Sequence, residues 1–193
     1  MKSTKEWSEK SAMKVRIKLH ENVCFVAESE SGHAIVMDGA PEGGGRNLGP
    51  RPMETVLMGT GGCTAYDVVH ILRKARAPVT DCVVEIAAER AAEDPKVFTT
   101  IHFHFIVTGT GLKAQQVERA VHLSAEKYCS ASIMLGKTAV ITHDFEILET
   151  VKVKDDPAFD LSDELTLLEQ IWIEKLRPFG ERGYNTGTKI RQA

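Results

Sequence analysis

The stretch GPRPMETVLMGTGGC, residues 49–63, decides the fold of this chain. Pro52 marks the start of a helix, because proline lacks the N–H group that the first helical turn leaves unpaired. From there to about Arg76, apolar and small residues recur at helical spacing, which predicts one long helix. Its buried stripe contains Leu57, Gly61, Ala65, Val68 and Leu72, and a more polar second stripe contains Gly59, Thr60, Cys63, Asp67 and His70.

Strand patterns flank this helix on both sides. Before it, alternating apolar residues predict three short strands, from Lys14 to a tight turn at Glu21-Asn22, over 23–27 and over 33–37. After it, the predicted elements are strands over 79–91 and 97–108, helices over 113–128 and 130–135, and a final strand over 140–148. In the strand over 97–108 the odd-numbered residues are expected to share one face. The order βββ-α-ββ-α-β predicts an α+β domain with its helices on one face of a largely antiparallel sheet.

The same pattern divides the chain into three parts. Residues 1–13 are polar and are expected to be a flexible lead, whereas residues 14–148 form the folded domain. Residues 149–193 are interpreted as an appendage with one helix over 162–176, whose apolar face could dock a partner or cover a pocket. The glycine-rich segment 38–50 lacks the spacing of both common phosphate-binding loops, so a mobile surface loop is favoured over a nucleotide site.

Composition and charge narrow the function classes. The 193 residues carry a formal net charge of -3, which gives no electrostatic support for binding nucleic acid. Apolar runs stay shorter than the ~18 residues of a membrane span, and the polar N-terminus does not resemble a signal peptide, so a cytoplasmic protein is expected. Four cysteines are too few for a disulfide scaffold, and none forms a CxxC pair that would indicate zinc, so no metal or cofactor is predicted.

Two of the cysteines lie in predicted helical segments, where a reactive thiol is chemically useful. A thiol attacks a peroxide only as the thiolate, and a second thiol can convert the sulfenic acid product into a disulfide. Cys63 and Cys129, each with small neighbours, are compatible with such a pair. Buried cysteine is also a common small core residue, and on residue type alone this packing role is favoured, above all for Cys24 and Cys82 in strands.

Residues 49–63, followed further along by AEKYCS at residues 125–130, resemble the OsmC/Ohr superfamily. The resemblance covers about residues 14–148, including the order of elements. It implies an intertwined homodimer in which two long central helices pack between sheets, with active sites at the interface. It also implies reduction of organic hydroperoxides without a cofactor, with Cys63 as the peroxidatic cysteine, Cys129 as the resolving cysteine, and a dithiol reductant that regenerates them.

In this family an arginine of the first hairpin activates the peroxidatic cysteine, and a glutamate holds that arginine. The first hairpin turn here contains no arginine, so Arg51 or Arg46 is the candidate for the cation, and Glu54 is the candidate for the glutamate. Glu54 precedes Cys63 by about two and a half helical turns, which places the two side chains on opposite sides of a continuous helix. A break near residues 59–62, or a contribution from the partner chain, would bring them together.

Three further observations leave alternatives open. His102 and His104 alternate along one strand and could bind a metal with a third ligand, although a polar, solvent-facing strand face is favoured. Met53, Met58 and Met134 could line an apolar pocket, although plain packing is favoured. The alternative function is a non-enzymatic dimer that binds a small apolar ligand or senses the redox state.

Overall fold

The computed structural model of the protein describes residues 13–149 and residue 166. The chain divides into two units, residues 1–150 and 151–193, and the fold below is that of the first. Two predicted parts of the chain lie outside the described residues, apart from their edges and residue 166. They are the lead over 1–13 and the appendage over 149–193, with its helix and its docking or covering role. They stay predictions. In the described residues, no helix is long and apolar enough to cross a membrane.

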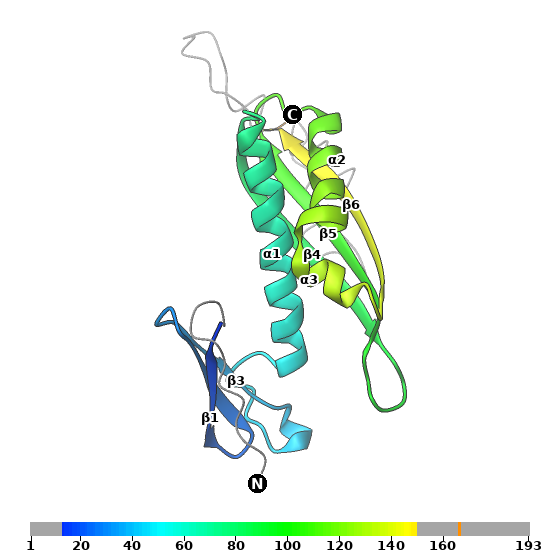
Figure 1. Ribbon diagram of the computed structural model, residues 1–193. Helices are drawn as coiled ribbons and strands as arrows, with labels where there is room; N and C mark the ends of the chain where they lie inside the picture. Colours follow the sequence, from blue (N-terminus) through cyan, green and yellow to red (C-terminus); the bar gives the residue numbers. More distant parts are fainter. Residues whose placement is uncertain (1–12, 150–165, 167–193) are drawn as a thin grey trace. The chain divides into compact units, whose positions relative to one another are not determined.

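The described unit contains two three-stranded sheets. The first sheet is antiparallel in chain order (Figure 1) and consists of β1 (Val15–Glu21), β2 (Cys24–Ser29) and β3 (Ala34–Met37). Asn22 in the β1–β2 turn has a φ of 50°, the left-handed region that asparagine tolerates, and the predicted turn is confirmed. Val15, Ile17 and Leu19 of β1 are all more than half exposed, so one face of this sheet lacks a cover within the described chain.

The second sheet has a different topology. It consists of β4 (Val79–Arg90), β5 (Phe98–Gly109) and β6 (Val140–Glu149), with β5 in the centre. β4 and β5 pair antiparallel, but β5 and β6 pair in parallel, so the expectation of antiparallel sheets is wrong at this edge. Between β5 and β6 the chain passes through helices, and such a crossover is what a parallel pair requires.

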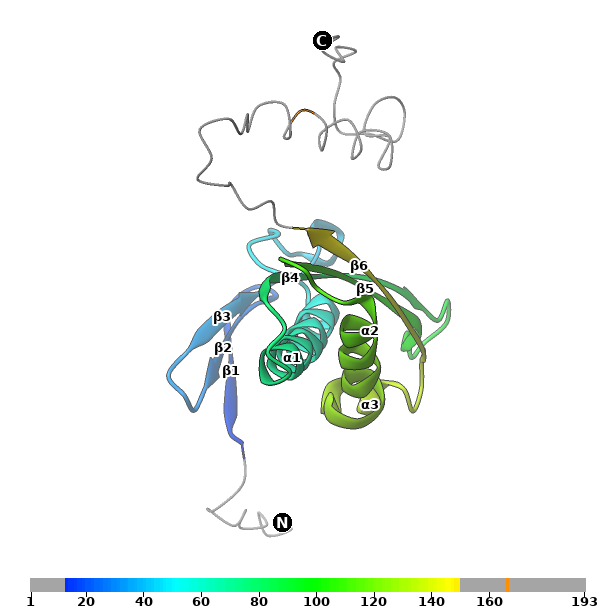
Figure 2. The same cartoon turned by 90° about the horizontal axis from the view of Figure 1, so that it is seen from above.

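Helices cover one face of the second sheet (Figure 2). They are α1 (Pro52–Lys74), α2 (Ala114–Leu123), η2 (Ser124–Tyr128) and α3 (Ser130–Leu135), and a short 3₁₀ turn, η1 (Pro41–Gly43), precedes α1. α1 begins at the predicted proline and runs without interruption. The predicted helix over 113–128 differs at its end, where η2 is a π turn. The predicted order βββ-α-ββ-α-β is confirmed, and so is the short helix predicted over 130–135, which is α3.

The core lies between the helices and the inner face of β5. It contains Val68 and Leu72 of α1, Ile101, Phe103, Phe105 and Val107 of β5, and Val117, Ala120 and Val121 of α2. Thr60, which belongs to the more polar stripe of α1, is buried as well. Its hydroxyl donates to the Val56 carbonyl at 2.8 Å, and burial therefore leaves no hydroxyl unpaired.

The expected alternation of β5 fails at the start of the strand. Phe98 is buried, whereas Val97, which was expected to share the face of the core residues, is 43% exposed. The pairing register shifts between Glu89 and Arg90 of β4, so that Thr99 has no partner there. This extra residue is a β-bulge, which changes the side of the sheet on which the preceding side chains lie.

The glycine-rich segment before α1 is organised by Asp38, which the sequence pattern did not single out. Asp38 is 1% exposed, and its carboxylate accepts the N–H groups of Gly39 at 2.7 Å, Arg46 at 2.9 Å and Leu48 at 3.1 Å. The bonds from Leu48 and Arg46 contribute most to lowering the pKa of Asp38. A Cβ at Gly49 would lie 2.3 Å from a carbonyl oxygen of β3, so glycine permits this close approach. The expectation of a mobile surface loop overlooked these contacts.

Candidate functional site

The fold brings together the two cysteines that the sequence singled out. Cys63 lies in α1, and Cys129 lies at the junction between η2 and α3. The sulfur atoms of Cys63 and Cys129 and a carboxylate oxygen of Asp67 all lie within 4.8 Å of one another. Asp67 follows Cys63 by one helical turn, so α1 presents both side chains on the same side. Both cysteines are free thiols.

The two thiols differ in their exposure to solvent. Cys129 is 0% exposed, and its Sγ accepts the N–H of Ser132 at 3.4 Å and its hydroxyl at 3.2 Å. Burial raises the pKa of the Cys129 thiol, the Ser132 bonds act against this rise, and the neighbouring Cys63 adds to it. Cys63 is only partly buried. A molecule from solvent can therefore reach Cys63, while Cys129 is held in the interior as a neutral thiol.

A chain of hydroxyl groups supports the cluster. The buried hydroxyls of Thr64 and Ser124 share a hydrogen bond of 2.8 Å, and Ser124 Oγ also donates to Asp67 Oδ2 at 3.4 Å. Ser124 begins the π turn, and its carbonyl accepts the N–H of Cys129 at 2.9 Å. Ser124 thereby ties α1 to the backbone that positions Cys129. The one-turn spacing of Cys63 and Asp67 was visible in the sequence, but nothing in the sequence pattern indicated the π turn.

The predicted activating pair forms a cap at the N-terminus of α1. The backbone N–H of Arg51 donates to Glu54 Oε2 at 2.8 Å, and the Arg51 guanidinium donates to Glu54 Oε1 at 2.9 Å. Both bonds lower the pKa of Glu54, and the backbone bond has the larger effect. α1 has no break at residues 59–62, so Glu54 and Cys63 are separated by about 14 Å along the helix axis. Arg51 and Glu54 are therefore not beside Cys63 in the same chain. Arg46, the other candidate cation, pairs with a β1 carboxylate at 2.6 Å.

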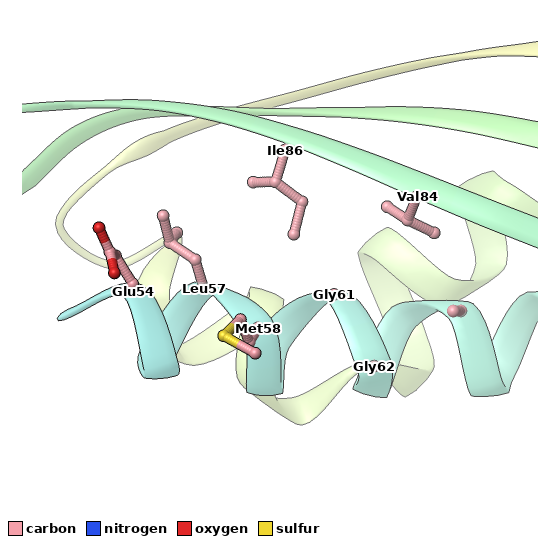
Figure 3. A pocket seen from close by; sticks show the side chains of 8 residues that line it. Glu54, Leu57, Met58, Gly61, Gly62, Val84 and Ile86 are labelled. Carbon is pink, nitrogen blue, oxygen red and sulfur yellow. The ribbon is translucent and has the colours of Figure 1, made fainter. Parts of the chain in front are cut away.

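An apolar groove of about 510 Å³ lies between α1 and β4 (Figure 3). Its lining residues are Glu54, Leu57, Met58, Gly61, Gly62, Ala65, Val84 and Ile86. A Cβ at Gly61 would lie 2.6 Å from Ile86 Cδ1, so glycine lets α1 approach β4 closely here. Of the three methionines considered for a pocket, Met58 lines this groove, Met53 packs against the core and Met134 is largely exposed.

The other two cysteines occupy packing positions. Cys24 is buried in β2, and Cys82 of β4 packs against the core of the second sheet. Burial, with a smaller contribution from the neighbouring carboxylate of Asp81, raises the pKa of Cys82 to about 11. A thiol with this pKa is almost entirely protonated near neutral pH, which makes Cys82 an internal reference for an unreactive cysteine.

His102 and His104 lie on the partly exposed face of β5. Their Nδ1 atoms form hydrogen bonds to β6, from His102 to the Thr142 hydroxyl at 2.8 Å and from His104 to Asp144 Oδ1 at 2.5 Å. The neighbouring imidazole of His104 contributes most to lowering the pKa of Asp144. These cross-strand bonds account for both histidines as polar residues of the outward face, which is the interpretation that the sequence favoured.

Comparisons relate the chain to known proteins. Residues 43–144 match the sequence profile of the family described as OsmC-like protein. Protein YhfA of Escherichia coli (strain K12) is 52% identical over 136 residues, which cover 70% of this chain and 98% of YhfA. A structure solved by structural genomics is 49% identical, with a TM-score of 0.65, and the match covers 72% of this chain and 100% of that chain.

A more distant crystal structure comes from Legionella pneumophila, where the protein is described as an organic hydroperoxide resistance protein OsmC. It is 16% identical, with a TM-score of 0.55, over 72% of this chain and 99% of that chain, and it therefore shows likeness of fold alone. The profile covers more than half of this chain, and YhfA is matched over nearly its whole length. The resemblance inferred from residues 49–63 and 125–130 is thereby confirmed. The chain belongs to the OsmC-like protein family.

Proposed function

We propose that this protein is a thiol-dependent peroxidase that reduces organic hydroperoxides with Cys63 and Cys129. The observation that carries the proposal is the separation of the two sulfur atoms, less than 4.8 Å, with one thiol partly exposed and the other fully buried. A partly exposed thiol can meet a peroxide, and a buried neighbour can trap the oxidised sulfur before a second peroxide arrives.

The cycle has three steps. The Cys63 thiolate attacks the distal oxygen of the hydroperoxide ROOH, the O–O bond breaks, and the alkoxide takes a proton and leaves as ROH, which oxidises Cys63 to a sulfenic acid. Cys129 loses its proton and attacks the sulfenic sulfur, which releases water and forms a Cys63–Cys129 disulfide. A dithiol reductant then exchanges with this disulfide, restores both thiols and is itself oxidised to a disulfide.

The distance between the sulfurs suits the second step. A disulfide needs about 2.05 Å between its sulfur atoms, so Cys63 and Cys129 would have to approach each other by less than about 3 Å. No cofactor takes part in this cycle. Because it depends on free thiols and on a dithiol, we place the protein in a reducing compartment, the cytoplasm.

We further propose that the active unit is an intertwined homodimer. On α1, Met58 is 62% and Tyr66 is 70% exposed, and the apolar residues of β1 are exposed as well. A second copy of the chain would cover these surfaces, and the removal of apolar area from water would stabilise the dimer. In the described residues no arginine hydrogen-bonds to the Cys63 sulfur, so we assign the activating cation to the partner chain, with Arg51 held by Glu54 as the candidate and Arg46 as the second choice.

Hydroperoxide consumption in the presence of excess dithiol tests the proposed enzyme. We expect Cys63→Ser to abolish turnover, because the attacking sulfur is gone. Assayed without the dithiol, Cys129→Ser should consume about two equivalents and then stop, the first to form the sulfenic acid and the second as Cys63 over-oxidises to the sulfinic acid. Cys82→Ala is the matched control and should retain the wild-type rate, since Cys82 lies outside the site. A Cys63→Ser variant that turns over at the wild-type rate would contradict the proposal.

A ligand-binding dimer is the second candidate function. The apolar groove of about 510 Å³ between α1 and β4 favours it, because small-molecule sites are concave and mostly apolar. Titration with an environment-sensitive apolar dye distinguishes the two functions. If the protein is a binding module, Cys63→Ser leaves dye affinity unchanged and the wild type consumes no peroxide. If it is the peroxidase, peroxide is consumed whether or not the dye binds.

A further inference from the structure

The cluster of Cys63, Cys129 and Asp67 has the donor atoms of a metal site. Among residues 13–149 and 166, it is the one group of three or more His, Cys, Asp or Glu side chains whose ligand atoms all lie within 4.8 Å of one another. The absence of a CxxC pair had excluded zinc at the level of sequence. The fold brings donor atoms together without such a pair, because the two thiols come from separate helical elements and the Asp67 carboxylate lies beside them.

The spacing of the donor atoms is close to that of a tetrahedral zinc site. Zinc binds thiolate sulfur at about 2.3 Å and carboxylate oxygen at about 2.0–2.2 Å, so neighbouring ligand atoms lie about 3.3–3.8 Å apart. The observed separations are no more than 4.8 Å and would therefore shorten by at most about 1.5 Å on binding. Two soft sulfur ligands and one oxygen favour Zn²⁺, or Co²⁺ as its substitute, over the hard cations Mg²⁺ and Ca²⁺.

Neighbouring groups already orient the donor atoms. The Ser124 hydroxyl donates to Asp67 Oδ2 at 3.4 Å, and Ser132 donates its N–H and its hydroxyl to the Cys129 sulfur. Outer hydrogen bonds of this kind hold ligands in place and commonly change metal affinity by about 10–100-fold. Cys63 and Asp67 are only partly buried, so an ion from solvent can reach the cluster.

We propose that the reduced protein binds one thiophilic divalent cation of the zinc type through Cys63 Sγ, Cys129 Sγ and an Asp67 carboxylate oxygen, with water as the fourth ligand. Binding releases the two thiol protons to solvent and involves no change in the oxidation state of sulfur or metal. Because the same sulfur atoms would form the disulfide, the metal-bound and disulfide forms exclude each other. The site does not depend on the proposed peroxidase cycle and would exist in a binding module as well.

Cobalt titration of the reduced full-length protein, under argon and free of reductant, tests this site. We expect saturation at one Co²⁺ per chain, a thiolate-to-cobalt charge-transfer band with the visible bands of tetrahedral cobalt, and loss of both when Zn²⁺ is added. Cys63→Ser should lose the charge-transfer band with the fold intact by circular dichroism, since Cys63 is not a core residue. Asp67→Asn should keep the band and weaken the affinity at least about tenfold.

The cobalt titration has a control variant and two outcomes that would contradict the metal site. Cys82→Ala should bind cobalt like the wild type, because Cys82 belongs to the packing of β4. A wild-type protein without a charge-transfer band, or a Cys63→Ser variant with an unchanged band, would overturn the site. Peroxide turnover is measured separately in metal-free protein, so a failure of the peroxidase proposal and a failure of the metal site give different results.

Discussion

Replacing Ser124 by alanine breaks the hydroxyl chain that ties α1 to the Cys129 junction. Ser124 is fully buried, and the Thr64 hydroxyl with which it shares a 2.8 Å hydrogen bond is buried as well. Without Ser124 Oγ, the Thr64 hydroxyl stays buried with no partner, and an unsatisfied group of this kind costs about 1–3 kcal/mol. We therefore expect Ser124→Ala to lower the free energy of unfolding by about 2 kcal/mol.

Thr64→Val is the matched partner for a double-mutant cycle. In this variant the single O–H of Ser124 still has an acceptor, either the carbonyl of residue 64 at 3.3 Å or Asp67 Oδ2 at 3.4 Å, so we expect a smaller loss of about 1 kcal/mol. The double variant leaves no unpaired hydroxyl, and the coupling energy should be about 1–2 kcal/mol. Urea unfolding of the reduced proteins, all at the same protein concentration, measures this coupling energy. Ser130→Ala is the control, and because Ser130 is exposed its free energy of unfolding should stay within about 0.5 kcal/mol of the wild type. If the losses of the two single variants simply add up in the double variant, the two hydroxyls do not depend on each other.

Three further predictions concern packing, acid stability and thiol reactivity. Gly61→Val should lower the free energy of unfolding by about 1–3 kcal/mol in urea, since even a Cβ there would lie 2.6 Å from Ile86 Cδ1; unchanged stability would contradict the close approach. The folded-state pKa of Asp38 is below its usual value, so its carboxylate stabilises the fold above about pH 4, and this contribution is lost as the pH falls through the folded pKa. Urea midpoints from neutral to acid pH should therefore fall less steeply in Asp38→Asn than in the wild type, and parallel curves would exclude the effect. Alkylation by iodoacetamide, followed by mass spectrometry of the native protein, should label Cys63 well before Cys82, whose pKa is about 11, and equal rates would be inconsistent with the burial described.

Local periodicity predicted the helices and much of the core. Pro52 fixed the start of α1, and the 3.6-residue repeat placed Val117 and Val121 in the interior, because both depend on residues that are neighbours along the chain. The start of β5 was predicted incorrectly, because the bulge at Thr99 depends on pairing with β4. The parallel pairing of β6 was missed for the same reason, since the partner of a strand is a nonlocal choice.

The candidate site was predictable only in part. The resemblance of two short segments pointed to Cys63 and Cys129, which the fold brings within 4.8 Å. The place of Asp67 one helical turn after Cys63 follows from the sequence, but the support from Ser124 depends on a π turn, which has no signature in residue pattern. The sequence left two ways to bring Glu54 to Cys63, a break in the helix or the partner chain, and α1 is unbroken, so Glu54 lies too far along it to take part from the same chain.

The most direct test of the central claim is the mass-spectrometric mapping of disulfides after one equivalent of an organic hydroperoxide is added to fully reduced protein. We expect the peptides containing Cys63 and Cys129 to become linked, with Cys24 and Cys82 still reduced. If Cys63 and Cys129 remain thiols while the peroxide is recovered unchanged, these two residues are not a redox pair.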